Sequence, residues 1–326
     1  MASPSAPSSP ETQRVPRGFV QRGLDTAAGI AREWLLPARG MTRTATWPLI
    51  GFGYIAVIAA LGGLRADHVL IGCLGCLDLY NQKSRSFLRT FLPFIATGVI
   101  FDSMRYFYWA GIDGRVHVAG PYELDKAWFG VGGKTLNEIF LEHHWAIADL
   151  FAGFAYLTFV AEFLALGMLL FFRGYTARAR TFAWCFLVVN VMGFITYFVY
   201  PAAPPWYVTA HGFGPIVTDV HPSAAAAQRF DELLGTHLFD AEYGRGIDVF
   251  GAIPSLHVAY PLMAAILAFK FVELKKLRWL AVAFSPLMCF SAIYLQHHYV
   301  IDVLIGLAYA VITVTVVTWA EKRWAR

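Results

Sequence analysis

Charged residues are scarce in this chain of 326 residues. They make up 15% of the sequence, whereas an ordinary soluble domain carries roughly a quarter. Hydrophobic residues make up 57%, and the mean hydropathy is +0.52. This composition argues against a soluble globular protein and predicts an integral membrane protein. The formal net charge is only +4, and we expect the lipid bilayer, not a nucleic acid, to be the partner.

Cysteine is also rare, with four residues that all fall in or beside apolar runs: Cys73, Cys76, Cys185 and Cys289. The CxxC spacing of Cys73 and Cys76 could mark a redox or metal pair, but no second pair accompanies it. We therefore interpret these cysteines as small buried residues and expect no disulfide framework. The outer histidines and carboxylates show no HExxH or comparable spacing, so we expect neither a metal nor another cofactor.

Long apolar runs fill most of the chain. A helix that spans a bilayer needs about 20 mostly apolar residues. Candidate spans lie near 48–64, 68–80, 88–110, 146–172, 181–200, 254–272, 279–296 and 299–319. The first two are short, so the sequence predicts an all-α polytopic bundle of six to eight transmembrane helices.

The distribution of charge supports eight spans. Basic clusters precede the first predicted span, follow the second, the fourth and the sixth, and close the chain, whereas the loops at 111–145 and 201–253 are rich in acidic residues. By the positive-inside rule, both termini are then cytoplasmic and the two long loops lie outside, in the periplasm or the Golgi lumen. We expect a disordered tail over 1–13, an amphipathic interfacial helix over 14–43 and a transmembrane catalytic domain over 44–326. We expect no cleavable signal peptide, because nothing near the start has an apolar core, and we find no internal repeat.

Three ionisable residues fall at the outer ends of apolar runs. His298 and Asp302 are spaced i, i+4, so a helix brings them to one face, and the aspartate can fix the imidazole tautomer. His257 opens the sixth predicted span, at the same membrane level by the topology above. Pro254 suits the first turn of that helix and Ser255 its cap, and exposed amides at a helix start attract phosphate. The three residues are thus candidates for catalysis at an anion site, although a lone His–Asp pair could also lock two helices together.

Further candidates for substrate binding surround this set. Arg245 lies in a glycine-flanked outer loop, where it could meet phosphate or be an ordinary loop residue, and His297 could donate to phosphate or face the interface. Arg105 and Asp102 sit inside a span and could form a structural pair or hold the headgroup. Two aromatic residues, Trp206 and Tyr207, could cover the site or anchor the chain at the membrane boundary. His143, His144 and Asp149 have poor spacing for a shared helical face, and we interpret them as loop and helix-start residues.

Two motifs, 251-GAIPSLH-257 and 294-YLQHHYVID-302, resemble the second and third signature motifs of the type-2 phosphatidic acid phosphatase superfamily. With 203-APPWY-207, they look like the inositol phosphorylceramide synthase branch, whose fungal members are sensitive to aureobasidin. The similarity covers about residues 190–310 and implies a six-helix lipid-phosphatase-like core. It further implies that His298 is a nucleophile forming a phosphohistidine, Asp302 its orienting carboxylate, and His257 the general acid.

The sequence departs from the phosphatases of that superfamily. They carry basic residues where this chain has Gly193, Tyr200 and Ala292. A phosphate monoester brings close to two negative charges and a diester only one, so a site with fewer cations suits a phosphodiester lipid. The resemblance therefore implies transfer of a phosphorylated headgroup, from phosphatidylinositol, to a ceramide-like lipid alcohol, with release of diacylglycerol.

Two alternatives remain open at this point. The same site could use water as acceptor, which would make the protein a lipid phosphate or diphosphate phosphatase. A non-enzymatic transporter or structural membrane protein could instead use the His–Asp groups as a proton path or a helix contact. Transporters often show repeated halves with broken helices, and this sequence shows no such symmetry. The sequence leaves the oligomeric state open.

Overall fold

The computed structural model describes residues 44–112, 114–217, 220–243 and 249–324. The predicted tail and interfacial helix at 1–43, and the candidate Arg245, lie outside these residues. The described chain forms two compact units, which divide after Arg89 within helix α5 (Gln82–Ser103). Each unit is described by itself below. Both are helical, which confirms the predicted all-α polytopic membrane bundle.

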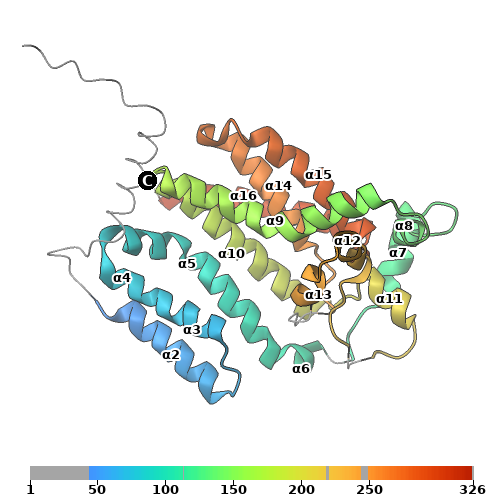
Figure 1. The fold of residues 1–326 in the computed structure, drawn as a ribbon, viewed down its shortest axis with the longest axis horizontal. Helices are drawn as coiled ribbons and strands as arrows, with labels where there is room; N and C mark the ends of the chain where they lie inside the picture. The colour runs from blue at the N-terminus through green and yellow to red at the C-terminus, as the bar shows by residue number, and fades with distance from the viewer. Residues whose placement is uncertain (1–43, 113, 218–219, 244–248, 325–326) are drawn as a thin grey trace, which may run out of the picture. The chain divides into compact units, whose positions relative to one another are not determined.

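Five long apolar helices form the centre of the second unit and run side by side (Figure 1). They are α9 (Ala146–Phe172), α10 (Thr176–Val199), α14 (Leu256–Lys270), α15 (Arg278–Tyr294) and α16 (Val300–Trp324). The part of α5 from Thr90 onward adds a sixth, because Phe94 packs its ring 4.6 Å from that of Phe186 and 6.4 Å from that of Phe163. Helix α14 contacts α9, α10, α15 and α16 and therefore lies at the middle of the bundle.

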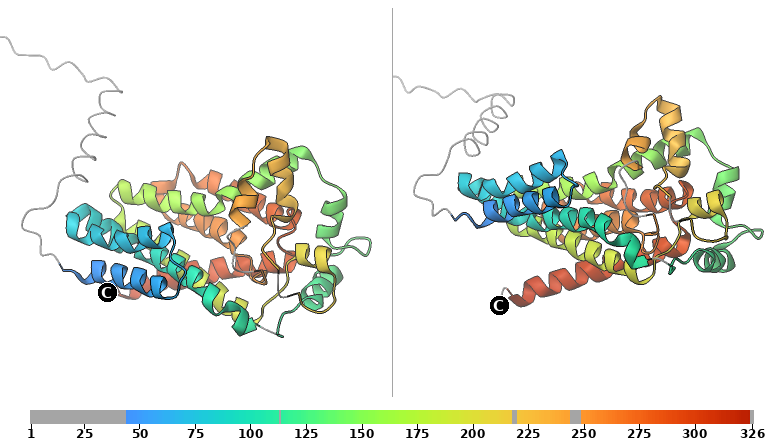
Figure 2. Two further views of the ribbon diagram at one scale, coloured as in Figure 1. Left: turned by 60° about the horizontal axis from the view of Figure 1, so that its bottom comes forward. Right: turned by 90° about the horizontal axis from the view of Figure 1, so that it is seen from below.

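Short helices gather at one end of these long ones, as the views in Figures 1 and 2 agree. They are α7 (Ala119–Phe129), α8 (Leu136–Glu142), α11 (Pro205–His211), α12 (Gln228–Leu234) and α13 (Leu238–Tyr243), and the smaller α6 (Tyr108–Ile112) follows α5. Gly153 lets α12 approach α9, since a Cβ at this glycine would lie 2.3 Å from the Phe230 ring. The predicted outer loops at 111–145 and 201–253 are thus largely helical where the structure describes them.

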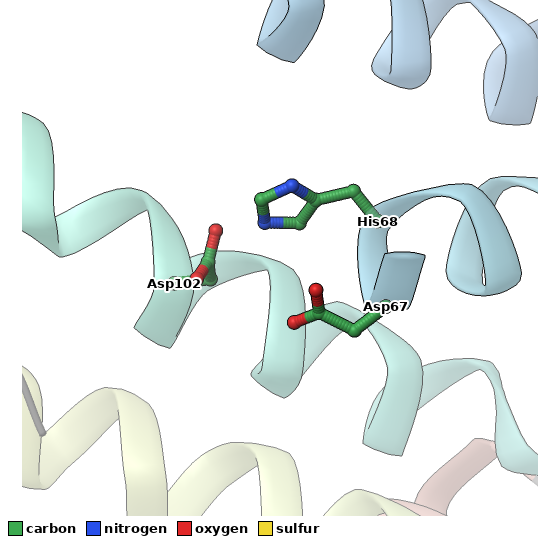
Figure 3. Close-up of side chains that lie close together, drawn as sticks. All are labelled: Asp67, His68 and Asp102. Atoms are coloured by element: carbon green, nitrogen blue, oxygen red, sulfur yellow. The ribbon is translucent and has the colours of Figure 1, made fainter. Parts of the chain in front are cut away.

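The first unit contains α2 (Thr46–Ala60), α3 (Ala66–Cys73), a 3-10 turn (Leu74–Cys76) and α4 (Leu77–Tyr80). Helices α2 and α3 pack closely at Gly51, where a Cβ would lie 2.0 Å from the Gly72 carbonyl oxygen. Asp67 and His68 open α3 (Figure 3). The Arg65 side chain pairs with the Asp67 carboxylate at 2.6 Å, and its backbone N–H donates to Nδ1 of His68 at 3.1 Å.

Four described helices are long and apolar enough to cross a membrane: Gln82–Tyr106, Ala146–Phe172, Thr176–Val199 and Val300–Arg323. Three apolar helices are shorter: Thr46–Ala60, Leu256–Lys270 and Arg278–Tyr294. The run predicted at 68–80 is not one continuous helix, because the 3-10 turn divides α3 from α4. Seven of the eight predicted runs therefore correspond to apolar helices of at least ten residues in the described chain, and the run at 68–80 does not. Helix α14, with 15 residues, is about 22 Å long, less than the roughly 30 Å of a hydrocarbon core.

Candidate active site

An extended segment leads into α14 and carries the first motif. Its backbone is paired with one other segment, at Ala202: the Ala202 N–H donates to the Phe250 carbonyl at 2.8 Å, and the Ala252 N–H donates to the Ala202 carbonyl at 3.3 Å. Ala202 and Ala252 are buried together with Ile253 in a small apolar cluster. This pairing satisfies backbone groups that lie away from water. It fixes the Ala252 carbonyl and delivers His257 to the first turn of α14.

The second motif forms the turn between α15 and α16. The N–H groups of His297 and His298 both donate to the carbonyl of Ala292, at 3.2 and 3.0 Å. Gln296 takes a φ of +71°, a left-handed conformation that reverses the chain and is uncommon for residues other than glycine. The side-chain amide of Asn137 on α8 donates to the His298 carbonyl at 3.0 Å. The turn is therefore held from both sides, and the two imidazoles project from a fixed backbone.

The two predicted catalytic histidines meet directly. Nδ1 of His257 lies 2.9 Å from Nε2 of His298, although 41 residues separate them in sequence. Nδ1 of His298 lies 2.9 Å from the carbonyl oxygen of Ala252 and 3.6 Å from Oδ2 of Asp302. His298 and Asp302 are buried, with 3% and 0% of their surfaces exposed. The structure thus brings together the three residues that the sequence singled out for catalysis.

These contacts define the imidazole tautomers. A carbonyl oxygen only accepts hydrogen bonds, so Nδ1 of His298 carries the proton that faces Ala252. Nε2 of His298 then carries the lone pair, which accepts the proton on Nδ1 of His257 in the contact between the two rings. His298 therefore presents an acceptor nitrogen, as a nucleophile requires, while His257 presents a proton, as a general acid requires.

Asp302 joins the two motifs through its backbone and side chain. Its Oδ2 accepts the Tyr299 N–H at 2.8 Å, and its carbonyl accepts the Ser255 N–H at 3.1 Å. The other carboxylate oxygen, Oδ1, is buried without a hydrogen-bond partner among the described residues. A carboxylate beside Nδ1 of His298 holds that ring in its tautomer and stabilises a positive charge on it.

Ser255 precedes the first residue of α14, as predicted, and is fully buried. Its hydroxyl has no hydrogen-bond partner within the described parts of the chain. Helix α16 passes very close here, because a Cβ at Gly306 would lie 2.2 Å from the Ser255 carbonyl oxygen. A free hydroxyl at a helix N-terminus, beside the histidine pair, is a ready donor to an anion.

Aromatic rings stack on the histidines in a ladder that sequence reasoning missed. The Tyr156 ring of α9 stacks on both His257 and His297, at 4.4 and 4.7 Å. Tyr243 also stacks on His297 at 4.9 Å, with its hydroxyl 3.2 Å from Nε2. Burial, followed by the neighbouring His298, lowers the pKa of His297 to about 3. His297 is consequently neutral near pH 7 and supplies no positive charge to a phosphate.

The other predicted binding residues lie as follows. Asp102 lies near the end of α5 (Figure 3) and forms an ion pair with Arg105 at 2.5 Å. Trp206 and Tyr207 begin α11 with 9% and 1% of their surfaces exposed. The Trp206 N–H donates to the Gln296 carbonyl at 3.0 Å, which places α11 against the turn that holds His298.

A second polar network at the outer end centres on Asp149, at the start of α9. Arg229 on α12 pairs with Oδ1 of Asp149 at 3.0 Å, the Tyr294 hydroxyl donates to the same oxygen at 2.9 Å, and Nδ1 of His144 lies 3.3 Å from Oδ2. His144 lies in the non-helical turn before α9 and Asp149 in the first turn of the helix, in agreement with their interpretation as loop and helix-start residues. Nothing in the spacing of Arg229, 80 residues away, indicated its role.

Asp125 on α7 is a further buried carboxylate that the sequence analysis missed. Its Oδ1 accepts the N–H of Ile301 at 3.0 Å and so caps the N-terminus of α16, one residue before Asp302. Burial raises the pKa of Asp125 to about 6. No pattern in the sequence connects these residues, because the contact joins two helices through residues 176 positions apart.

The fold and the site together define a class of protein. It is a polytopic helical membrane protein in which two histidines and a carboxylate meet at the start of a helix. The family model of the PAP2 superfamily matches residues 122–316. The chain belongs to this superfamily. No solved structure matches it.

Curated relatives agree with this assignment. The chain is similar to the phosphoinositol dihydroceramide synthase of Bacteroides thetaiotaomicron, with 39% identity over 268 residues that cover 79% of this chain and 86% of the relative. It is also similar to the inositol phosphorylceramide synthase of Candida albicans, with 28% identity over 59% of this chain and 40% of the relative. The catalytic subunit of the Saccharomyces cerevisiae synthase is 36% identical over 36% of this chain and 29% of the relative. The match thus spans less than half of each of these two fungal relatives. The protein is a membrane transferase similar to inositol phosphorylceramide synthases.

Proposed function

We propose that this protein transfers the phosphoinositol headgroup of phosphatidylinositol to a ceramide-like lipid alcohol and releases diacylglycerol. The observation that carries the proposal is the contact of the two histidines, in which Nε2 of His298 is the acceptor and Nδ1 of His257 is the donor. The names of the relatives from Bacteroides thetaiotaomicron and Candida albicans support the inositol-containing donor and the ceramide-type acceptor.

The first step forms a phosphohistidine. Nε2 of His298 attacks phosphorus, and the bond from phosphorus to the diacylglycerol oxygen breaks. Beside the negative phosphodiester, His257 acts as an imidazolium with a proton on each nitrogen. The departing oxygen takes the Nδ1 proton, so diacylglycerol leaves as a neutral alcohol and His257 is left as a neutral imidazole. The imidazolium formed at His298 keeps its Nδ1 proton, which the Ala252 carbonyl and the Asp302 carboxylate stabilise. Such general acid help contributes roughly 100- to 10,000-fold to a rate.

The second step reverses the proton movement. The acceptor hydroxyl gives its proton to Nδ1 of His257 while its oxygen attacks phosphorus. The bond from phosphorus to Nε2 of His298 breaks, and both histidines return to their starting states. Splitting one displacement into two easier ones is the advantage of covalent catalysis. The Ser255 hydroxyl and the N-terminus of α14 would hold the single negative charge of the diester.

The positions where related phosphatases carry basic residues support a diester substrate. A Cβ at Gly193 would lie 3.0 Å from the Leu256 side chain, so α10 and α14 leave no room there for a long basic residue. Tyr200 stacks on His117 at 3.9 Å, and Ala292 is fully buried beneath the histidine turn. These positions serve packing, and they add no cation for a second phosphate charge.

A transfer assay tests the proposal. The purified protein is incubated with phosphatidylinositol labelled in its phosphate, with and without ceramide. We expect a labelled inositol phosphoceramide only when ceramide is present, and its loss in His298→Ala and His257→Ala. Release of labelled inositol phosphate or free phosphate at the same rate without ceramide would favour a hydrolase. Intact transfer in His298→Ala would contradict the histidine mechanism.

We further propose that the site opens on the non-cytoplasmic face, with both termini in the cytoplasm, because the basic clusters lie on the opposite side of the predicted spans. Val131, in the outer loop at 111–145, is exposed and offers a labelling position. In a variant without the four native cysteines, Val131→Cys is expected to react with an impermeant thiol reagent added to intact bacterial cells. In Golgi vesicles it is expected to react only when the reagent has access to the lumen. Reaction from the cytoplasmic side alone would overturn this orientation.

A further inference from the structure

Glu162 is an ionisable residue inside the long apolar helix α9 that the mechanism does not use. Both of its carboxylate oxygens are buried, and neither has a hydrogen-bond partner among the described residues. Other buried carboxylates of the described chain, such as those of Asp302 and Asp78, have a partner on at least one oxygen. Burying a polar group without a partner costs free energy, and an ionisable group within a membrane helix points to a function.

The position of Glu162 relates it to the catalytic pair. It lies three residues after Phe159, whose ring centroid is 4.6 Å from that of His257, so the two α-carbons are about 4.5 Å apart along the helix axis. Glu162 also falls seven residues after Ala155 and four before Leu166, both of which are buried in the bundle. Its helical face is therefore directed into the protein, one turn deeper along α9 than the residue that contacts His257.

We propose that Glu162 binds the acceptor lipid, by accepting hydrogen bonds from the amide N–H and the neighbouring hydroxyl next to the reacting alcohol. This inference rests on the proposed function. A ceramide-like acceptor places its reacting hydroxyl at His257, and its amide lies two carbons away on the side of the lipid chains. Glu162 lies below His257 along α9, where those polar groups would otherwise enter the apolar core.

The same contact distinguishes the acceptor from the alcohol that leaves. Diacylglycerol has one hydroxyl, and its remaining polar groups are ester oxygens, which only accept hydrogen bonds. The oxygens of Glu162 accept hydrogen bonds, so the site favours a lipid that brings donors. A typical hydrogen bond contributes about 0.5–1.5 kcal/mol, which corresponds to a preference of about 2- to 12-fold for each donor. Glu162 would thus bias the site towards forward transfer.

The experiment compares ceramide with N-methyl ceramide, which lacks the N–H, as acceptors for the wild type and for Glu162→Leu. The full-length protein is used in lipid nanodiscs with phosphatidylinositol as donor. We expect the wild type to show a kcat/KM about 2- to 12-fold higher for ceramide. Glu162→Leu is expected to use both acceptors equally, below the level of the wild type with N-methyl ceramide because the hydroxyl contact is lost as well, while the KM for phosphatidylinositol stays unchanged. Glu162→Gln, which keeps an accepting oxygen, is expected to retain part of the preference.

A matched control is Glu321→Leu, which removes a carboxylate near the end of α16 whose oxygens accept the Thr181 hydroxyl at 2.9 Å. This variant is expected to keep the full ceramide preference. An unchanged preference in Glu162→Leu would overturn the inference while leaving the proposed function intact. A wild type that uses both acceptors equally would do the same. A wild type that forms no product with either acceptor would overturn both.

Discussion

Arg229 is predicted to be the residue whose removal most weakens the outer end of the bundle. Its Nε pairs with Asp149 at 3.0 Å, its guanidinium lies 4.8 Å from the Tyr294 ring centroid, and it donates to the Ala226 and Tyr294 carbonyls at 3.1 and 3.3 Å. Only 15% of the Arg229 side chain and 4% of that of Asp149 are exposed. Arg229→Met keeps most of the apolar stem but leaves a buried carboxylate without its cation.

The magnitude follows from this burial. Breaking a buried ion pair by removing one partner costs about 3–5 kcal/mol. Because Tyr294 still donates to Asp149, we expect the lower end, about 3 kcal/mol. For a unit of this size, that corresponds to a fall in Tm of roughly 6–12 °C. The activity should fall as well, since α12 leads into α13, whose Tyr243 stacks on His297.

Thermal unfolding of the purified protein in detergent, followed by intrinsic fluorescence, measures the effect. Arg178→Met serves as the control, because Arg178 is half exposed and lies 4.0 Å from Glu273, a pair expected to contribute less than about 1 kcal/mol. In Asp149→Asn, the further loss caused by Arg229→Met should shrink, since the carboxylate charge is gone. A Tm for Arg229→Met within 1 °C of the control would refute the reasoning.

Two further predictions concern the N-terminal part of α16. Gly306→Ala should lower kcat by about 100-fold, because its Cβ would lie 2.2 Å from the Ser255 carbonyl oxygen and force α14 and α16 apart near the histidines. Gly98→Ala is the control in the transfer assay, because no atom lies within 4 Å of a Cβ there. Equal activity of the two variants would contradict the prediction. For Asp125, the pKa is raised to about 6 in the folded state, so its contribution to stability is present below about pH 4 and is lost as the pH rises towards 6. The Tm of the wild type should therefore fall relative to that of Asp125→Asn between pH 4 and pH 7, and parallel pH profiles of the two would show that Asp125 does not titrate there.

The sequence predicted the helical class and the meeting of His257, His298 and Asp302 because both depend on local patterns. Apolar runs of sufficient length define α9, α10 and α16, and the short motifs carry His257, His298 and Asp302 at the helix starts. Helix N-termini face the same end of a bundle when the helices share a direction, so the meeting of the histidines could be anticipated. The measured 2.9 Å contact confirms that they meet.

The supporting residues could not be predicted in the same way. Tyr156 looks like any aromatic residue on an apolar helix, yet it stacks between His257 and His297. Arg229 and Asp125 act through contacts to residues 80 and 176 positions away, and nothing periodic links such distant partners. Arg105 and Asp102 form the ion pair with each other that the sequence allowed.

The contacts of the two catalytic histidines also indicate which of them moves during the reaction. In the resting site, the lone pair of His298 is occupied by the proton of His257, so a phosphate group must separate the rings before phosphorus can be attacked. Hydrogen bonds fix direction, and His298 is held by the Ala252 carbonyl beside the Asp302 carboxylate. The described ring contacts of His257 are, by contrast, the stacked Tyr156 ring, the tilted Phe159 ring and the His298 ring itself. Stacking permits a ring to slide in its plane at little cost. In the proposed mechanism, His257 is therefore the ring that moves. An imidazole that can slide along the Tyr156 ring is suited to carry a proton to the departing oxygen and to take another from the incoming alcohol.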